Sequence, residues 1–154
     1  MMNKALGLAA QALFVSNPNP RGGCVLVAPD GREIGSGHTQ QAGGPHAEVM
    51  ALRSAQEAGH STRGATAYVT LEPCAHQGRT GPCCDALVAA GIGKVVASLE
   101  DPNPLVAGQG FARLRAAGVA VEVGPGAAAA RELNIGFFSR MVRGTPWVRL
   151  KVAA

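Results

Sequence analysis

The spacing of hydrophobic and polar positions predicts helices and strands along the first half of the chain. Apolar residues recur near helical spacing over residues 3–15 and stop at Asn17-Pro18-Asn19-Pro20, a run that breaks helices. Farther on, Pro29-Asp30-Gly31 separates two short strand-like runs and predicts a β-hairpin. A Gly-rich loop, residues 42–45, precedes the next helical pattern. The predicted elements are helix 3–15, strands 24–28 and 33–37, helix 46–58 and strand 67–71.

The second half alternates between helix and strand patterns. Pro82 suits the first turn of a helix, where its missing N–H would have no partner in any case. The elements that follow are strand 94–99, helix 110–117, strand 119–123, helix 127–141 and strand 147–152. Such alternation predicts an α/β fold with helices on both faces of a mostly parallel sheet. Because no repeat, linker or domain break divides the pattern, we expect a single domain over residues 1–154.

The composition is that of a globular protein with a hydrophobic core. Of the 154 residues, 47% are hydrophobic and 16% are charged, which is unlike a disordered chain. No apolar run approaches the roughly 20 residues that a membrane span needs. Residues 1–16 carry a single Lys and no small-residue cleavage site, so they do not resemble a signal peptide. We therefore expect a cytoplasmic protein with no membrane partner.

Charge and cysteine content narrow the classes of function further. The net charge of +4 suits an anionic ligand, but there is no basic run and there are few aromatic residues, so we expect no nucleic-acid partner. Four cysteines, two of them adjacent (Cys83 and Cys84), are too few and too clustered for a disulfide scaffold. In a reducing compartment, cysteines clustered with histidine indicate a metal site or catalysis.

The strongest chemical signal is a His-x-Glu triplet followed by two spaced cysteines. His46 and the Cys74…Cys83 pair each come at a loop-to-helix junction after a predicted strand. The positive potential of a helix N-terminus stabilises a thiolate over a thiol. Two thiolates and one imidazole are three ligands for tetrahedral Zn²⁺ and leave a fourth position for water, as in catalytic zinc sites. We expect one zinc ion per chain, held by His46, Cys74 and Cys83, and no other cofactor.

Glu48, two residues beyond His46, is expected to face the same space without being a ligand. A carboxylate placed there takes a proton from water and passes it to a ring nitrogen and then to the departing amine. His/Cys/Cys ligands with a separate Glu match the pattern of zinc deaminases. One alternative is that Cys84 replaces Cys83 as the ligand. Otherwise Cys84, like Cys24, is a small core residue.

At this point the chain resembles the cytidine-deaminase superfamily, most closely the deaminase domain of bacterial bifunctional riboflavin-biosynthesis proteins. The segments that carry the resemblance are Pro18-Asn19-Pro20, residues 42–48 (AGGPHAE), residues 71–83 (LEPCAHQGRTGPC), Asp101-Pro102-Asn103-Pro104 and residues 148–153 (VRLKVA). The His-x-Gly-Arg-Thr segment between the two cysteines is highly specific, since most cytosine, cytidine and tRNA-adenosine deaminases carry a short Cys-x-x-Cys there. The resemblance implies a three-layer α-β-α sandwich around a five-stranded mixed sheet.

The resemblance also implies the reaction, the hydrolytic deamination of a cyclic amidine. The substrate would be 2,5-diamino-6-ribosylamino-4(3H)-pyrimidinone 5′-phosphate, which loses its 2-amino group as ammonia and gives the corresponding aminouracil phosphate. Substrate contacts carry over from the family's loops around the metal. The candidates are Asn19 for the pyrimidine, His76 and Arg79 between the cysteine ligands (Arg79 for the phosphate), Asp101 and Asn103 for the ribose hydroxyls, and Lys151 in the last strand.

Several of these residues have simpler explanations. Asn19, Asp101 and Asn103 are also ordinary turn formers, and Lys151 would suit an edge strand without any ligand. Arg79 offers a fork suited to phosphate but could equally be solvated. These alternatives stay open at the level of sequence.

The sequence departs from the family pattern in a few places. The usual Tyr-His after the second strand reads His38-Thr39, which makes His38 a candidate replacement for a His often implicated in substrate contact. Gly22 stands where an apolar residue is usual. The chain stops after Ala154, where bifunctional relatives continue into an NADPH-dependent reductase, and nothing in it suggests a nicotinamide site. We therefore expect a deaminase domain alone.

Two other functions stay open. One is a deaminase acting on another base, nucleoside or tRNA, and the other is a zinc-binding or substrate-binding module without turnover. Deaminases of this class usually pair through exposed helices and sheet edges, so we expect a homodimer or a larger homo-oligomer.

Overall fold

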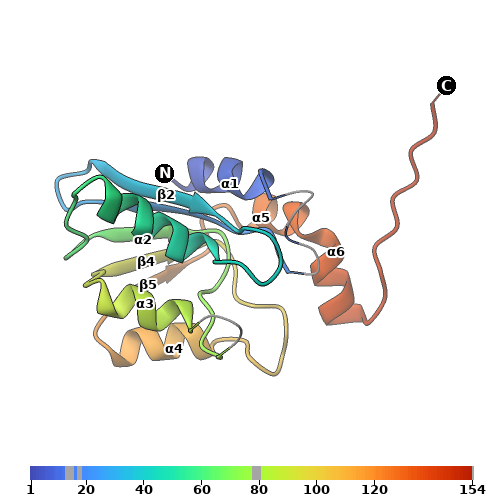
Figure 1. The fold of residues 1–154 in the computed structure, drawn as a ribbon. Coiled ribbons are helices and arrows are strands. Elements are labelled where there is room, and N and C mark those ends of the chain that lie inside the picture. Colours follow the sequence, from blue (N-terminus) through green and yellow to red (C-terminus); the bar gives the residue numbers. More distant parts are fainter. Residues whose placement is uncertain (13–15, 17–18, 78–80, 154) are drawn as a thin grey trace.

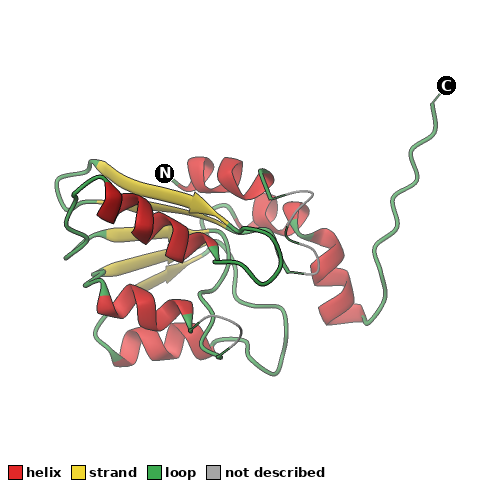
Figure 2. Ribbon diagram, viewed as in Figure 1, coloured by secondary structure: helices red, strands yellow, loops and turns green. Residues whose placement is uncertain are grey.

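A five-stranded mixed sheet forms the centre of the structure, a computed structural model that describes residues 1–12, 16, 19–77 and 81–153 (Figures 1 and 2). Its strands, in spatial order, are β2 (Glu33–His38), β1 (Gly23–Val27), β3 (Thr66–Val69), β4 (Lys94–Ala97) and β5 (Ala120–Val123). β1 runs antiparallel to both of its neighbours, whereas β3, β4 and β5 run parallel. β2, β3 and β4 therefore end at the same edge of the sheet.

Helices cover both faces of this sheet (Figure 1). One layer contains α2 (Ala47–Glu57), α3 (Cys83–Ala89) and α4 (Gln109–Ala116), and the other contains α1 (Met2–Ala10) and α5 (Ala127–Leu133). β1 is buried along its whole length because both layers cover it, which explains why it is apolar without alternation. This is the three-layer α-β-α sandwich with a five-stranded mixed sheet that the family resemblance implies.

The core is divided by the sheet. The larger part, under α2, α3 and α4, includes Leu26, Val69, Leu87, Val95 and Leu114. The smaller part, under α1, is built from Met2, Ala5, Val25, Val27 and Val96. Alternate residues of β1 point to the two sides, so this one strand contributes to both.

Small residues let α2 approach the sheet closely. A Cβ atom added at Gly35 would collide with the Ala51 carbonyl oxygen, and one added at Gly37 would lie 2.5 Å from the Cβ atom of Met50. Alanines of α2, such as Ala51 and Ala55, are fully buried against β2. This close packing fixes the N-terminus of α2, which carries His46 and Glu48.

The C-terminal region differs from the sequence prediction in two ways. The predicted helix 127–141 is interrupted at Asn134 and continues as α6 (Ile135–Phe138) and a π-helical turn, η1 (Ser139–Arg143). The predicted strand 147–152 is wrong, because these residues extend from the body without a partner strand (Figure 1). The mostly parallel sheet is also corrected, since two of its four strand pairings are antiparallel.

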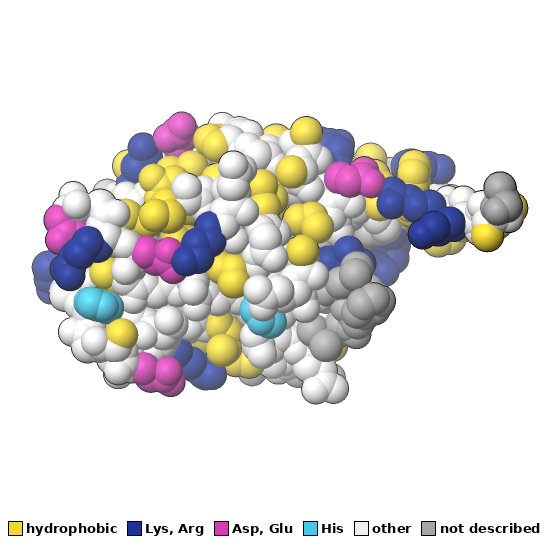
Figure 3. Space-filling view, turned by 90° about the horizontal axis from the view of Figure 1, so that it is seen from above, with side chains coloured by type: hydrophobic (Ala, Val, Ile, Leu, Met, Phe, Trp, Pro, Cys, Tyr) yellow, Lys and Arg dark blue, Asp and Glu magenta, His cyan; other side chains and the backbone are white. Residues whose placement is uncertain are grey.

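The surface is mixed in character. Figure 3 shows the face that carries α1, where hydrophobic side chains are interspersed with acidic and basic ones and the C-terminal tail projects at one end. The most exposed large hydrophobic residues of the described chain include Val148, Leu150 and Val152 of this tail. Among the helices of the described residues, none is both long and apolar enough to cross a membrane.

The prediction for helix 3–15 reaches residues 13–15, which lie outside the described chain.

Candidate active site

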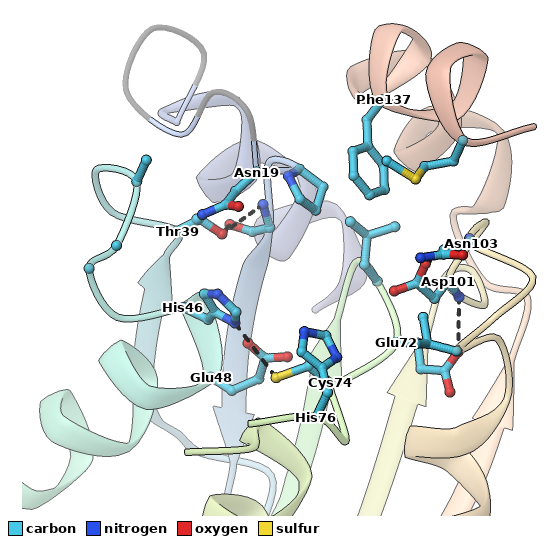
Figure 4. A pocket seen from close by; sticks show the side chains of 18 residues that line it. Asn19, Thr39, His46, Glu48, Glu72, Cys74, His76, Asp101, Asn103 and Phe137 are labelled. Carbon is cyan, nitrogen blue, oxygen red and sulfur yellow. Dashed lines mark hydrogen bonds between the residues drawn. The ribbon is translucent and has the colours of Figure 1, made fainter. Parts of the chain in front are cut away.

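A cavity of about 650 Å³ opens at the edge of the sheet where β2, β3 and β4 end. Ligands of open α/β sheets bind in such crevices beyond the carboxyl ends of the strands. The cavity is lined by the segment before β1, the loops after those three strands, the N-terminus of α2, and the α6–η1 region. Figure 4 shows its labelled side chains converging from these different elements.

Two of the three predicted metal ligands, His46 and Cys74, line the floor of the cavity, and the third, Cys83, is buried in contact with them. His46 is the N-cap of α2, Cys74 lies in the loop after β3, and Cys83 is the first residue of α3. The Nδ1 atom of His46 is 3.3 Å from the Sγ atom of Cys83 and 3.8 Å from that of Cys74. The ligand atoms of all three residues lie within 4.8 Å of one another.

This geometry fits zinc. Ligands held tetrahedrally at ordinary Zn–S and Zn–N lengths lie about 3.5–3.8 Å apart, close to the separations observed. Two thiols and an imidazole are also a donor set that zinc favours over calcium or magnesium. The Cys74 Sγ atom accepts a hydrogen bond from the Cys83 backbone N–H, which orients it toward the other ligands. His46, Cys74 and Cys83 therefore fit a zinc site, and the cysteine that joins the cluster is Cys83 rather than Cys84.

The two thiols of the site differ in acidity. Hydrogen bonding with the Cys83 side chain, helped by His46 and the Cys83 backbone N–H, lowers the pKa of Cys74 to about 4. The same side-chain contact, with burial, raises the pKa of Cys83. Hydrogen bonding with Cys74 also raises the pKa of His46. One thiolate thus forms readily at this position before any cation is considered.

Glu48 lies in the first turn of α2, beside the metal ligands (Figure 4). Only 8% of its surface is exposed, and burial raises the pKa of its carboxyl group. It lines the cavity but is not part of the ligand cluster. The structure therefore places an ionisable, largely desolvated carboxyl group next to the ligands.

Two departures from the family pattern prove to be in contact. The Thr39 hydroxyl lines the cavity and accepts a hydrogen bond from the Gly22 backbone N–H at 3.0 Å. A Cβ atom at Gly22 would lie 2.9 Å from that hydroxyl oxygen, so glycine at 22 accommodates threonine at 39. His38 is not among the described residues that line the cavity, and its Nδ1 atom lies 3.1 Å from the Thr39 carbonyl oxygen. Thr39 rather than His38 therefore occupies the cavity wall next to Asn19 (Figure 4).

The opposite side of the cavity carries Asp101 and Asn103, and His76 lines the cavity near Cys74 (Figure 4). Sequence reasoning missed the residue that holds this side in place. Glu72 is buried, and its carboxylate accepts hydrogen bonds from three backbone N–H groups, those of Asp101, Gly108 and Phe111. In the sequence, only its position directly before Pro73-Cys74 could have suggested that Glu72 belongs to the site.

Two further residues were predicted to contact the substrate. Arg79 lies outside the described residues. Lys151 is exposed on the C-terminal tail and is not among the residues that line the cavity. Its placement is a correction, because the strand that was expected to carry it has no partner in the sheet.

Two further lining residues, Phe137 and Met141, were also missed. They belong to the α6–η1 region, more than 50 residues beyond the last metal ligand, and no motif marks them. The remaining cysteines, Cys24 and Cys84, are not part of the ligand cluster and belong to the larger core.

Comparisons with known proteins give a consistent result. Residues 1–99 match the family model for the cytidine and deoxycytidylate deaminase zinc-binding region. The chain is 55% identical over 153 residues to the riboflavin biosynthesis protein RibD of Escherichia coli, covering 99% of this chain and 41% of that protein. It is 43% identical to the diaminohydroxyphosphoribosylamino-pyrimidine deaminase of Buchnera aphidicola subsp. Schizaphis graminum, covering 94% of this chain and 96% of that one.

A solved structure agrees with these relatives. Acinetobacter baumannii RibD superposes with a TM-score of 0.91 at 54% identity, over 98% of this chain and 42% of that chain. The chain thus spans about two fifths of the length of the RibD proteins that it matches and nearly all of the Buchnera deaminase.

Proposed function

Because the chain belongs to the zinc-binding cytidine and deoxycytidylate deaminase family, we propose that it deaminates 2,5-diamino-6-ribosylamino-4(3H)-pyrimidinone 5′-phosphate in riboflavin biosynthesis. The products are 5-amino-6-(5-phosphoribosylamino)uracil and ammonia. The observation that carries the proposal is the buried Glu48 carboxyl group beside a His46/Cys74/Cys83 cluster, with Glu48, His46 and Cys74 lining a cavity of suitable size. Near-complete coverage of the Buchnera deaminase supports the choice of substrate.

The cavity has the dimensions of a small-molecule site. Its volume of about 650 Å³ lies within the usual range for such pockets, roughly 300–1,000 Å³. Polar groups converge from opposite sides, with Asn19 and Thr39 on one side and Asp101 and Asn103 on the other. We assign Asn19 to the pyrimidine ring, and Asp101 and Asn103 to the ribose hydroxyls.

The chain's residues divide the chemistry between them. A zinc ion held by His46, Cys74 and Cys83 would supply Lewis acidity that lets water act as a nucleophile near neutral pH. Glu48 accepts a proton from the attacking water and delivers it to the adjacent ring nitrogen as the new C–O bond forms. Glu48 then takes the remaining proton of the added hydroxyl group and supplies it to the amine as the C–N bond breaks and the C=O bond forms, and ammonia leaves. Burial keeps this carboxylate close to the reacting atoms and away from bulk water.

The test is ammonia release from the enzymatically prepared phosphoribosyl diaminopyrimidine, with zinc content measured on the same sample. We expect one zinc per chain and stoichiometric conversion to the aminouracil. Turnover of cytosine, cytidine or a tRNA adenosine, with none of this substrate, would identify a deaminase of another specificity. Stoichiometric zinc with no ammonia from any of these compounds would indicate a binding module.

A further inference from the structure

The interruption of the last helical region at Asn134 coincides with a set of contacts to the cavity wall. Asn134 is 4% exposed, and its Oδ1 atom accepts a hydrogen bond from the Arg21 backbone N–H at 2.6 Å. Its Nδ2 group donates to the Arg21 carbonyl oxygen at 2.9 Å. The Arg21 guanidinium in turn donates to the Leu133 carbonyl oxygen at 3.0 Å. Three hydrogen bonds therefore join the α5–α6 junction to a residue 113 positions earlier.

Arg21 sits between the residues of the cavity wall. Asn19, Pro20 and Gly22 all line the cavity, so the Asn134 contacts fix the wall segment at its centre. On the other side of the junction, α6 begins at Ile135 and presents Phe137 to the same cavity. A single buried amide thus sets the relative position of two walls.

Phe137 is the only Phe, Tyr or Trp among the described residues that line the cavity. Figure 4 shows its ring directed into the cavity from the side opposite Glu48 and Cys74. The ring is held by an edge-on contact with Phe138, at 6.4 Å between centroids, and by the Arg140 guanidinium 5.6 Å from its centroid. Contacts on more than one side restrict the rotation of this ring.

We propose that Phe137 contacts the flat heterocycle of the substrate, and that Asn134 is the residue that positions Phe137 for this contact. The inference rests on the proposed function, because it requires a planar ring bound above the zinc site. A flat ring held between Phe137 and the metal ligands presents its amidine carbon to the floor of the cavity. Phe137 therefore acts in substrate binding and takes no part in proton transfer.

The first test replaces Phe137 in the full chain. Stacking between an aromatic side chain and a nucleobase changes binding by roughly 5- to 150-fold on alanine substitution. We expect Phe137→Ala to raise the KM for the phosphoribosyl diaminopyrimidine about tenfold, within that range, and to leave zinc content and kcat near wild type. Phe137→Tyr keeps the ring and should keep the KM. Ile135→Ala, in the same short helix but outside the cavity lining, is the matched control.

An unchanged KM in Phe137→Ala, with wild-type turnover and zinc, would overturn the inference while leaving the proposed function intact. Failure of the wild type itself to turn over this substrate would count against the proposed function instead. If KM changes by the same factor and in the same direction in Ile135→Ala and Phe137→Ala, the effect belongs to α6 in general. That result would also overturn the role of the Phe137 ring.

The second test concerns Asn134. Asn134→Ala should raise KM with little change in kcat, because α6 loses its link to Arg21. The double variant Asn134→Ala/Phe137→Ala should bind substrate about as weakly as Phe137→Ala alone, since both changes remove the same contact. If the KM of the double variant instead rises by the product of the two single-variant increases, Asn134 acts independently of Phe137. That result would overturn its assignment as a positioning residue.

Discussion

Glu48 combines two properties that conflict in an ordinary surface carboxylate. It is almost fully buried, which disfavours its charged form. It also lies beside the residues that would bind zinc, and the positive charge of a bound zinc ion would favour the charged form. A carboxyl group balanced in this way changes protonation state easily when a proton is offered or withdrawn. The structure thus gives a physical reason to separate the proton-transfer role of Glu48 from ligand binding.

Glu48→Gln should therefore keep the zinc and the fold but lose turnover. Glutamine has nearly the shape of glutamate and can still hydrogen-bond water, but it does not accept a proton and return it. General acid–base catalysis contributes about 10²–10⁴-fold, and one residue serving several transfers should reach the upper end. The measurement is single-turnover ammonia release beside zinc content. If the variant keeps the wild-type rate, Glu48 is only a carboxylate at a helix terminus. If the variant lacks zinc, Glu48 is a zinc ligand.

The four cysteines should separate into two classes when each is replaced by serine. Cys74→Ser and Cys83→Ser should lose most of the zinc, since each removes one of three convergent ligands. Cys24→Ser and Cys84→Ser should keep it, because neither thiol belongs to the cluster of ligand atoms. Elemental analysis of the purified variants decides this. If Cys84→Ser empties the site and Cys83→Ser does not, the ligand has been assigned to the wrong neighbour.

The predictability of these site residues follows from how local their partners are. His46, Glu48, Cys74 and Cys83 belong to short motifs at helix starts or in the loop before one, and such motifs could be found without knowing the fold. Glu72 and Asn134 act through backbone groups up to 39 and 113 residues away, and no local pattern announces those partners. Phe137 looked like one more apolar residue of a helix. Its function depends on where the interruption at Asn134 directs it.

The position of α2 depends on small residues in the strand beneath it. Gly35 leaves no room for a Cβ atom against the Ala51 backbone, so Gly35→Ala should push the helix away from β2. Overpacking of this kind costs about 1–3 kcal/mol of folding free energy. Thermal unfolding of the zinc-loaded protein measures the loss.

Gly7→Ala is the opposite-sign control for that substitution. Gly7 lies within α1, and nothing is within 4 Å of a Cβ atom added there. Alanine in a helix interior should stabilise by roughly 0.5–1 kcal/mol relative to glycine. If Gly35→Ala is as stable as wild type, the close approach of α2 is not required by the fold.

The strands that the sequence predicted correctly are those that have a partner in the sheet, and the correctly predicted helices pack on the sheet or on one another. β1 to β5 and the helices between them lie within a few residues of their predicted positions. The pattern of 147–152 is equally strand-like, but a strand needs a neighbour, and β2 and β5 form the edges of the described sheet without it. Helix 127–141 fits a continuous pattern and is interrupted at Asn134, where the side chain bonds Arg21. Both differences from the prediction involve distant parts of the chain, a partner strand in the first case and the Arg21 backbone in the second.

The molecule as a whole has the active-site cavity at the end of its sheet and an extended tail that leaves the body near η1 (Figure 1). Val148, Leu150 and Val152 alternate along this tail, so they share one side of an extended chain and are 77–85% exposed. Exposed apolar surface of this kind favours contact with another protein surface. The predicted homo-oligomer stays a prediction, and sedimentation of the full chain against one lacking the tail would test whether the tail contributes to it.

Removal of residues 148–154 should leave zinc content, kcat and KM unchanged. The tail's ion pair, Arg149 with Glu132 at 2.6 Å, joins two side chains that are each about two-thirds exposed, and exposed pairs contribute only about 0–1 kcal/mol. The expected change in melting temperature is no more than about 3 °C for a chain of this size. Lys151→Ala in the full chain is the matched control, since Lys151 is the tail residue that the family resemblance assigns to the substrate. A similar rise in KM for both variants would mean that Lys151 reaches the substrate during turnover, and the tail would then have to fold back over the cavity.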